Sequence, residues 1–326
     1  MPKILHTACY TGIPLEILKS VVPESFTVKT LDELSYECLL RECYDADYLL
    51  VSGRLPIDEG VLSAAKQLKM IQRTGVGTDM LDLEAIKRHH IPVYVNRGVN
   101  ARSVAEHTMT LMLCCLKNIP QISQNVKNGI WKKQQTGISC NEIYGKTVGL
   151  VGMGAIGRQV SIYLKAFGAS VFYTDPYRLS EDQEQELNVN YVSTFQELLP
   201  MVDILSFHCP LTSDNKAMFN AQTISMMKQG AVVVNTARGK LIDEKALYHA
   251  LVNGHLRSAG LDVHYEEPIK KDCPLFALDN VILTPHIGGL TLESFTNMLQ
   301  RAVCNIVNFE TGNMDLIKDY LYNIVD

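Results

Sequence analysis

A glycine-rich turn carries the strongest chemical signal in this sequence. Gly152, Gly154 and Gly157 form the pattern G-x-G-x-x-G directly after an apolar run, and a helical pattern follows them. In such turns the first glycine permits a tight bend, the second lets a pyrophosphate approach the backbone, and the third lets helix and strand pack closely. The N-terminus of the following helix offers N–H groups and a positive dipole end to phosphates, so the motif predicts dinucleotide binding.

An acidic residue follows this turn at a useful distance. Asp175 ends the next apolar run, 18 residues after Gly157. An acid at roughly 20 residues binds the hydroxyls of the adenosine ribose, and its charge repels a 2′-phosphate. The sequence therefore predicts NAD rather than NADP, although Arg178 is close enough to relax that preference. The simpler alternatives are a turn without a ligand and an ordinary Asp-Pro turn signal.

Three further charged residues each follow a predicted strand: Arg238, Glu267 and His286. Open α/β sheets bind ligands outside the carboxyl ends of their strands, so these side chains are expected to converge at one edge. Reduction of a ketone requires a hydride on carbon and a proton on oxygen. Histidine can donate that proton near neutral pH, a carboxylate can orient the imidazole and stabilise its charged form, and an arginine fork can hold a substrate carboxylate.

Each of the three also has a simpler explanation when taken alone. Arg238 could cap a strand, Glu267 could be a turn residue, and most of the nine histidines, His264 among them, need only a structural or surface role. Their joint placement after successive strands of a dinucleotide-binding fold favours catalysis.

The elements that must position these residues can be read from the apolar pattern. Short β-branched runs alternate with longer helical patterns, which predicts βαβ units and a doubly wound α/β architecture. Runs without polar alternation are typical of parallel strands that are covered on both faces. The predicted strands are 3–7, 26–31, 48–52, 70–74 and 92–96 in the first half, and 147–151, 170–175, 203–208, 231–237, 258–263 and 281–284 in the second. The main predicted helices are 15–21, 35–44, 59–68, 81–89, 100–116, 158–167 and 292–311, and the segment 125–141 is expected to be looser.

Composition narrows the class of protein. The 326 residues are 47% hydrophobic and 20% charged, which is typical of a globular chain of two ordinary domains. A formal charge of -5 without a Lys/Arg cluster argues against a nucleic-acid partner. Nine cysteines without a C-x-x-C pair indicate no metal site, no disulfide framework and a reducing cytoplasmic location. The most apolar helical stretch falls short of the ~20 residues that span a bilayer, so no membrane role is expected.

The sequence resembles the D-isomer-specific 2-hydroxyacid dehydrogenase family over nearly its whole length. The resemblance is strongest between about residues 96 and 290. The segments that carry it are NARSVAEH (100–107), YGKTVGLVGMGAIGR (144–158), SFHCPLT (206–212), VNTARGKLIDEKA (234–246), GLDVHYEEP (260–268) and LTPHIGG (283–289).

The resemblance implies an NAD-dependent oxidoreductase that interconverts a D-2-hydroxyacid and its 2-keto acid. Its catalytic arginine falls on Arg238, its acid on Glu267 rather than Glu266, and its general acid/base on His286. It also implies a Rossmann NAD-binding domain, residues 100–292, inserted into a flavodoxin-like substrate domain, residues 1–99 and 293–326. Family members are typically homodimers that pack through their NAD-binding domains. The helix 100–116 is the candidate interface, and its Met109, Met112 and Leu116 fit either a core or an interface.

The resemblance adds further cofactor and substrate residues. Besides the three glycines and Asp175, cofactor contacts are implied at Ala155, Ile156, His208, Cys209, Pro210, Thr236, Ala237, Asp262 and Gly288. The substrate segments are Ser52, Gly53 and Arg54, and Arg73, Val76 and Gly77. Arg73 matches a residue that phosphoglycerate dehydrogenases direct at the substrate phosphate, whereas Val51 replaces a second expected arginine and Arg54 could substitute for it.

Two questions stay open at this level. Phosphoglycerate, glyoxylate, hydroxypyruvate and larger 2-keto acids all compete as substrates. The same fold and the same three residues also occur in NADH-sensing transcriptional co-repressors, which gives an alternative function as a binding protein. Turnover of a keto acid would distinguish the two.

Overall fold

The protein, described here from a computed structural model covering residues 1–322, divides into two compact units. One unit contains residues 1–100 together with the C-terminal residues from Leu290 onward, and the other contains residues 101–289. These divisions fall within three residues of the expected ones, 1–99 with 293–326 and 100–292.

The sheet of the first unit has six strands in the order β13-β5-β4-β3-β1-β2. Its five parallel strands follow the flavodoxin-like order, in which β1 and β3 flank the point where the winding reverses. The edge strand β13 runs antiparallel to β5; the sequence analysis missed it because it is only three residues long. The strands are β1 (Lys3–His6), β2 (Thr27–Thr30), β3 (Tyr48–Val51), β4 (Met70–Arg73), β5 (Val93–Tyr94) and β13 (Tyr320–Tyr322).

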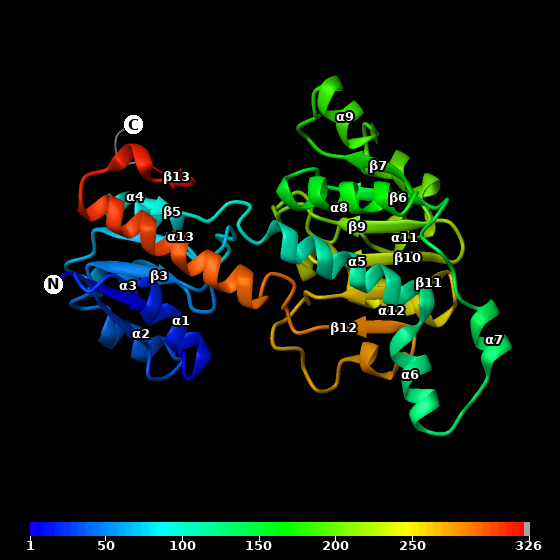
Figure 1. Cartoon of the computed structure of the whole chain (residues 1–326), viewed down its shortest axis with the longest axis horizontal. Coiled ribbons are helices and arrows are strands. Elements are labelled where there is room, and N and C mark those ends of the chain that lie inside the picture. The colour runs from blue at the N-terminus through cyan, green and yellow to red at the C-terminus, as the bar shows by residue number, and fades with distance from the viewer. Residues whose placement is uncertain (323–326) are drawn as a thin grey trace. The chain divides into compact units, whose positions relative to one another are not determined.

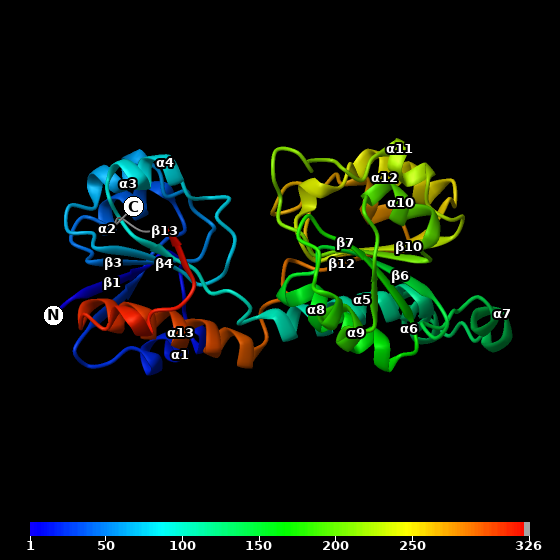
Figure 2. The ribbon, with the colours of Figure 1, turned by 90° about the horizontal axis from the view of Figure 1, so that it is seen from above.

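Helices cover both faces of this sheet (Figure 2). Helices α1 and α13 pack on one face, where Leu299 and Ile306 of α13 join Tyr48 and Tyr94 in the core. Helices α2, α3 and α4 cover the other face. Each begins at an N-cap residue whose side chain accepts a hydrogen bond from a backbone N–H group, as Asp58 does from Val61. Their bounds are α1 (Ile13–Val21), α2 (Tyr36–Glu42), α3 (Glu59–Ala64), α4 (Leu83–Arg88) and α13 (Leu292–Glu310).

The second unit is built on a parallel sheet of seven strands in the order β12-β11-β10-β9-β6-β7-β8 (Figure 1). This is the Rossmann order with one added strand, and the winding reverses between β6 and β9. The strands are β6 (Thr147–Val151), β7 (Ser170–Thr174), β8 (Val189–Tyr191), β9 (Ile204–Phe207), β10 (Ala231–Asn235), β11 (Leu256–Leu261) and β12 (Val281–Leu283). The predicted α/β fold with doubly wound sheets is confirmed, and β8 is the strand that the sequence analysis missed.

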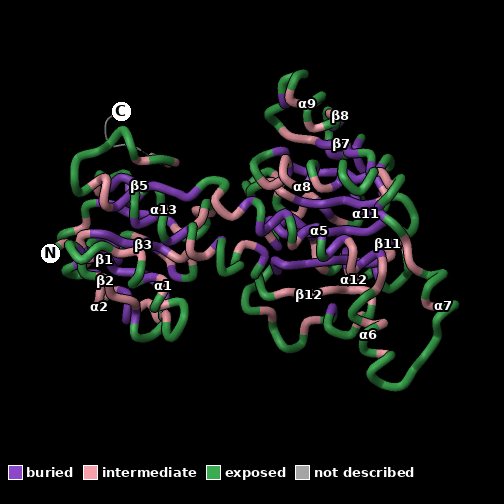
Figure 3. The backbone as a smooth tube through the Cα atoms, viewed as in Figure 1, coloured by how far each residue is buried: buried purple, intermediate pink, exposed green. Residues whose placement is uncertain are grey.

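Two helical layers sandwich this sheet (Figure 2). Met109, Met112 and Leu116 of α5 are 6%, 0% and 2% exposed and lie in the core of their own chain. The segment expected to be loose, 125–141, instead contains the end of α6 and the whole of α7, two largely exposed helices (Figure 3). The helices are α5 (Ala101–Lys117), α6 (Ile119–Lys127), α7 (Lys133–Ile138), α8 (Ala155–Ala166), α9 (Glu181–Leu187), α10 (Phe195–Leu198), α11 (Ala221–Ser225) and α12 (Glu244–Val252).

Three chain-wide features bear on function. Within residues 1–322, none of the helices combines the length and the apolar character needed to cross a membrane. All nine cysteines are free thiols. The same residues contain no cluster of three or more His, Cys, Asp or Glu side chains that could hold a metal ion.

Candidate active site

The glycine turn joins β6 to α8 at the point where the winding of the second sheet reverses. Gly152 has φ 103°, and a Cβ there would lie 2.7 Å from the Cys209 nitrogen. A Cβ on Gly157 would lie 2.3 Å from the Gly152 oxygen, whereas a Cβ on Gly154 would meet no atom within 4 Å. The first and third glycines are thus required by close backbone packing, and the second leaves open space beside the backbone.

The start of α8 is suited to an anion. Gly154 is its N-cap and makes no side-chain capping bond, so no capping side chain serves the N–H groups of Ala155 and Ile156. Such N–H groups and the dipole of a 12-residue helix attract a pyrophosphate. The residues present therefore fit a dinucleotide.

Asp175 lies beside the same turn, at the end of β7. Its Oδ2 accepts a hydrogen bond from the Met153 N–H at 2.7 Å, and its Oδ1 accepts one from the Tyr177 N–H at 2.8 Å. The carboxylate is therefore held in place next to the glycine turn. Arg178, which could have relaxed the preference for NAD, instead donates from Nε and Nη2 to the two carboxylate oxygens of Glu184, both at 2.9 Å.

The end of β9 forms the other wall of the turn. The His208 ring lies 2.9 Å from the Ser206 hydroxyl through Nε2, and its buried Nδ1 has no partner among the described residues. Burial lowers the pKa of His208 to about 3 and raises the pKa of the Cys209 thiol to about 11. Both side chains are therefore uncharged at neutral pH, and His208 is not suited to donate protons. The Pro210 carbonyl accepts a hydrogen bond from Asn215 at 2.8 Å.

The three candidate catalytic residues follow β10, β11 and β12, which are neighbours in the parallel sheet. Nδ1 of His286 lies 2.7 Å from Oε2 of Glu267, so these two residues form a direct pair. Burial raises the pKa of the Glu267 carboxyl, but hydrogen bonds from His286 and from the His264 N–H outweigh it and leave that pKa below its ordinary value. The His286 side chain remains 50% exposed, so its other ring nitrogen can serve a substrate.

Arg238 follows β10, and its Nη1 donates to the Ala237 carbonyl at 2.7 Å. Its neighbour Gly239 lies against the backbone of the next loop, where a Cβ would come within 2.0 Å of the His264 carbonyl. His264 donates its N–H to Oε1 of Glu267 at 3.0 Å, and its ring lies 2.9 Å from the Thr284 carbonyl oxygen. His264 thus ties the loops that carry Arg238, Glu267 and His286 to one another.

Asp262 fixes the loop that carries His286. Its carboxylate is 1% exposed and accepts hydrogen bonds from the Thr284 hydroxyl (2.6 Å) and from the N–H groups of Ile287 (2.9 Å) and Gly288 (2.8 Å). His286 itself has φ 56°, a conformation that costs a non-glycine residue of order 1–3 kcal/mol. Because Asp262 binds the backbone just after His286, it holds that strained conformation in place.

Three other predicted cofactor residues also make hydrogen bonds within this unit. The Gly288 carbonyl accepts from the Ser103 hydroxyl at 2.6 Å. The Thr236 hydroxyl lies 2.9 Å from that of Thr108, and the Ala237 N–H donates to Asn235 at 3.0 Å. Their contacts, and that of Asp262, with a cofactor stay predictions.

Two histidines that the sequence analysis did not place in the site contact its loops. His107 of α5 lies 3.0 Å from the Thr284 hydroxyl and 3.3 Å from Asp262, which joins the long helix to the His286 loop. His264, which was expected to be structural or at the surface, is 7% exposed and contacts the loops that carry Glu267 and His286, so its role is structural. Both lie within segments that carried the family resemblance, which was the available signal.

The predicted substrate residues lie at the carboxyl edge of the first sheet. Arg73 is 8% exposed and donates from Nε to the Gly77 carbonyl at 2.7 Å and from Nη1 to the Val51 carbonyl at 2.8 Å. A Cβ on Gly53 would lie 2.5 Å from this guanidinium. Arg73 therefore braces the two substrate segments against each other.

The remaining residues of these segments differ from Arg73 in their contacts and exposure. The Ser52 N–H donates to the Thr7 hydroxyl at 3.1 Å, and the Ser52 hydroxyl donates to the Thr7 carbonyl at 3.1 Å. Arg54 is exposed and Val76 is 45% exposed. Within this unit, Arg54 rather than Arg73 presents its charge at the surface.

Together, the Rossmann order, the open glycine turn and the His–Glu pair at the carboxyl edge define a dinucleotide-binding α/β protein with a candidate proton-transfer site. Residues 109–288 match the family described as D-isomer specific 2-hydroxyacid dehydrogenase, NAD binding domain. The chain belongs to the D-isomer specific 2-hydroxyacid dehydrogenase family.

Similar proteins extend the match over most of the chain. It is 38% identical over 267 residues to the hydroxypyruvate reductase of Thermotoga maritima, covering 81% of this chain and 85% of that one. It is 42% identical over 295 residues to the D-3-phosphoglycerate dehydrogenase of Methanocaldococcus jannaschii, covering 90% of this chain but 55% of that one. The chain spans about half the length of the curated D-3-phosphoglycerate dehydrogenases that it matches.

Solved structures agree with the fold. The D-lactate dehydrogenase of Aquifex aeolicus, solved with NAD and lactic acid, superposes with a TM-score of 0.84 at 30% identity and covers 98% of both chains.

Proposed function

We propose that this protein is an NAD-dependent oxidoreductase that interconverts a D-2-hydroxyacid and its 2-keto acid. The observation that carries the proposal is the His286–Glu267 pair, 2.7 Å apart, in loops at the carboxyl edge of a Rossmann sheet. Arg238 follows the neighbouring strand of the same sheet. NAD, when bound, supplies or accepts the hydride.

Each of the three residues has a distinct task in the proposed reaction. In the direction of reduction, His286 gives the proton on Nε2 to the keto oxygen, while Nδ1 stays hydrogen-bonded to Glu267. Glu267 remains ionised because its pKa is lowered, so it stabilises the imidazolium before the transfer. Arg238 holds the substrate carboxylate and polarises the adjacent carbonyl.

The proposed cofactor site uses the glycine turn, Asp175 and the end of β9. The N–H groups at the start of α8 hold the pyrophosphate, and the Asp175 carboxylate takes the adenosine ribose. The uncharged His208 and Cys209 line the adjacent wall. The side-chain positions described above support this placement.

For the substrate, we propose a small, unphosphorylated 2-keto acid such as hydroxypyruvate or glyoxylate. Arg73 is buried and braces two backbone segments, and the second expected arginine is Val51, which is fully buried. Both facts argue against a phosphate subsite at these positions. The relative that matches over 85% of its own length is named as a hydroxypyruvate reductase.

We also propose a homodimer that packs through the NAD-binding units, in a reducing cytoplasm. Trp131 and Ile138 in the α6–α7 region are 78% and 85% exposed, and apolar surface of this kind marks contacts between proteins. The nine free thiols support a reducing compartment. Sedimentation at micromolar concentration measures the assembly, and a monomer there would contradict the dimer.

The direct test is NADH oxidation against a panel of keto acids. Glyoxylate, hydroxypyruvate, phosphohydroxypyruvate, pyruvate, phenylpyruvate and 2-ketogluconate should give kcat/KM values that rank the small unphosphorylated acids first. Tight NADH binding with no turnover of any acid would instead favour the co-repressor-like alternative.

The His286→Ala variant tests the assigned proton transfer. Loss of a general acid should lower kcat by about 10²–10⁴-fold and leave NADH affinity nearly unchanged. His249→Ala, which removes an exposed imidazole on α12 of the same unit, is the matched control. Full activity without the His286 imidazole would refute its role.

A further inference from the structure

Arg178 is a cation placed three residues beyond the acid that selects the cofactor. It follows Asp175 in the loop between β7 and α9, where a Rossmann fold places the adenosine ribose. An arginine in this region is the group by which such folds accommodate the 2′-phosphate of NADP. The position of its guanidinium therefore bears on cofactor choice.

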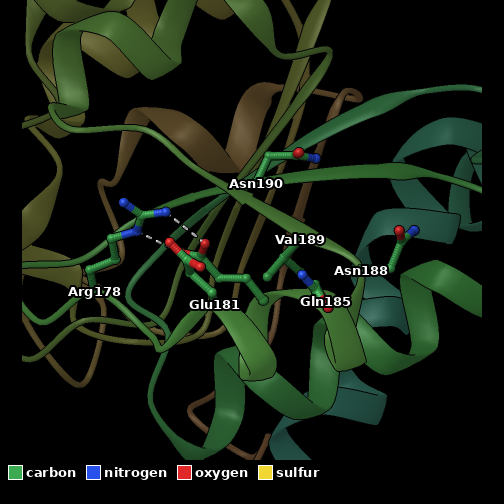
Figure 4. Close-up of a pocket in the computed structure, with 7 residues that line it drawn as sticks. Arg178, Glu181, Gln185, Asn188, Val189 and Asn190 are labelled. Atoms are coloured by element: carbon green, nitrogen blue, oxygen red, sulfur yellow. Dashed lines mark hydrogen bonds and ion pairs between the residues drawn. The ribbon is translucent and has the colours of Figure 1, made fainter.

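The structure shows this guanidinium directed at Glu184 on α9. Both carboxylate oxygens of Glu184 accept from Arg178 at 2.9 Å, a bidentate geometry that fixes the fork. Figure 4 shows Arg178 turned towards this helix, with the two contacts dashed. The same guanidinium lies 5.0 Å from the centre of the Tyr191 ring, which supports it from another side.

Glu184 is itself anchored. The hydroxyl of the buried Tyr173 donates to its Oε1 at 2.6 Å, and the Leu179 N–H donates to that hydroxyl at 3.0 Å. Hydrogen bonds from Arg178 and Tyr173 lower the pKa of Glu184 to about 2, so the pair stays ionised at neutral pH. The loop after Asp175 is therefore held to α9 through a side chain that does not move freely.

We propose that Glu184 is a specificity-determining positioning residue: by holding Arg178 in a bidentate pair, it withholds this cation from the 2′-phosphate of NADP. This inference rests on the dinucleotide binding proposed above. Asp175 repels the phosphate, and Glu184 removes the charge that could compensate. Discrimination against NADP thus has two sources, of which the sequence showed one.

The test measures dinucleotide binding without any substrate. Kd values for NADH and NADPH are determined by fluorescence titration for the wild type, Glu184→Gln, Arg178→Ala and the double variant. Glu181→Gln is the matched control, because Glu181 lies on the same helix, lines the same cavity of about 330 Å³ and makes the same charge change.

Glu184→Gln should tighten NADPH binding about tenfold, which corresponds to about 1.4 kcal/mol, and leave the Kd for NADH unchanged. Adding Arg178→Ala should abolish that gain. Arg178→Ala alone should leave the NADPH/NADH ratio as in the wild type, because Arg178 is already withheld.

Several outcomes would overturn the inference. The Glu184→Gln variant could bind NADPH no better than Glu181→Gln does, or it could bind both dinucleotides more weakly by the same factor. The double variant with Arg178→Ala could also keep the tighter binding of NADPH. Weaker NADPH binding by Arg178→Ala alone would also refute it, without depending on the Glu184 variant. Failure of the wild type to bind either dinucleotide would instead remove the proposed function itself.

Discussion

The carboxyl edges of the two sheets use their charged residues in opposite ways. In the second unit, His286 and Glu267 keep half-exposed side chains, 50% and 38%, while the buried Asp262 and His264 fix the loops that carry them. In the first unit, Arg73 is buried and fixes the loops itself through the carbonyls of Gly77 and Val51.

This difference shows when a charged residue at the end of a strand can contact a ligand: another polar group must hydrogen-bond the loop backbone in its place. Loop backbone that leaves a sheet must satisfy its hydrogen bonds, and some polar group has to supply them. Where Asp262 does so, the neighbouring His286 can face a substrate. In the first unit the buried Arg73 supplies hydrogen bonds of this kind itself, beside Thr74, whose N–H also donates to the Val51 carbonyl.

The largest effect should come from breaking the contact between the loops that carry Arg238 and Glu267. Gly239→Ala places a Cβ 2.0 Å from the His264 backbone, which cannot yield as a flexible side chain would. We expect a loss of about 3 kcal/mol in the free energy of unfolding, together with most of the kcat/KM. Gly137→Ala, where a Cβ meets no atom within 4 Å, is the control. Equal stability of the two variants would show that the loops are not locked together.

Asp262→Asn tests whether, in the second unit, Asp262 holds the loop that presents His286, the candidate catalytic residue. An amide NH₂ facing the N–H groups of Ile287 or Gly288 would lose a hydrogen bond, so unfolding should become easier by about 1–3 kcal/mol. Because His286 is displaced, kcat should fall more than KM rises. Asp279→Asn, a change of an exposed acid that precedes β12, should alter neither. A normal kcat in Asp262→Asn would mean that the His286 backbone keeps its strained conformation without the Asp262 carboxylate.

Arg73→Lys asks whether the first unit's arginine is a brace or a phosphate ligand. Lysine has no fork to bridge two carbonyls, so the free energy of unfolding should fall by about 1 kcal/mol. KM should rise by the same factor for every keto acid. A selective loss for phosphohydroxypyruvate relative to hydroxypyruvate would show instead that Arg73 reads a phosphate. The exposed Arg54→Ala serves as the comparison and should leave stability unchanged.

The smallest effect concerns the Arg178–Glu184 pair and pH. The pKa of Glu184 falls from its ordinary 4.5 to about 2 on folding, so the unfolded chain takes up its proton first as pH falls. The pair therefore stabilises the fold above pH 4.5, and that contribution disappears between pH 4.5 and 2. The difference in Tm between the wild type and Glu184→Gln should be constant near neutral pH and vanish in acid. A difference that persists at pH 2 would contradict this linkage.

The sequence by itself determined the architecture and named the candidates for the reactive groups. Apolar runs without alternation specify parallel strands, because both faces of such a sheet are covered, and the G-x-G-x-x-G spacing specifies the turn through steric limits that act locally. The short strands β8 and β13 and the six-residue helix α7 were missed because elements of three to six residues leave little periodic signal.

Only the tertiary structure decided which polar groups face outward and which brace the fold. Arg73 and Arg238 both stand at strand ends, and His107 and His264 both lie in motif segments. Sequence position does not say which carbonyl or carboxylate lies close to each of them. Such pairings join residues far apart in the chain, as Asp262 with Gly288 and Arg73 with Val51. They depend on packing between loops, which residue type and spacing along the chain do not specify.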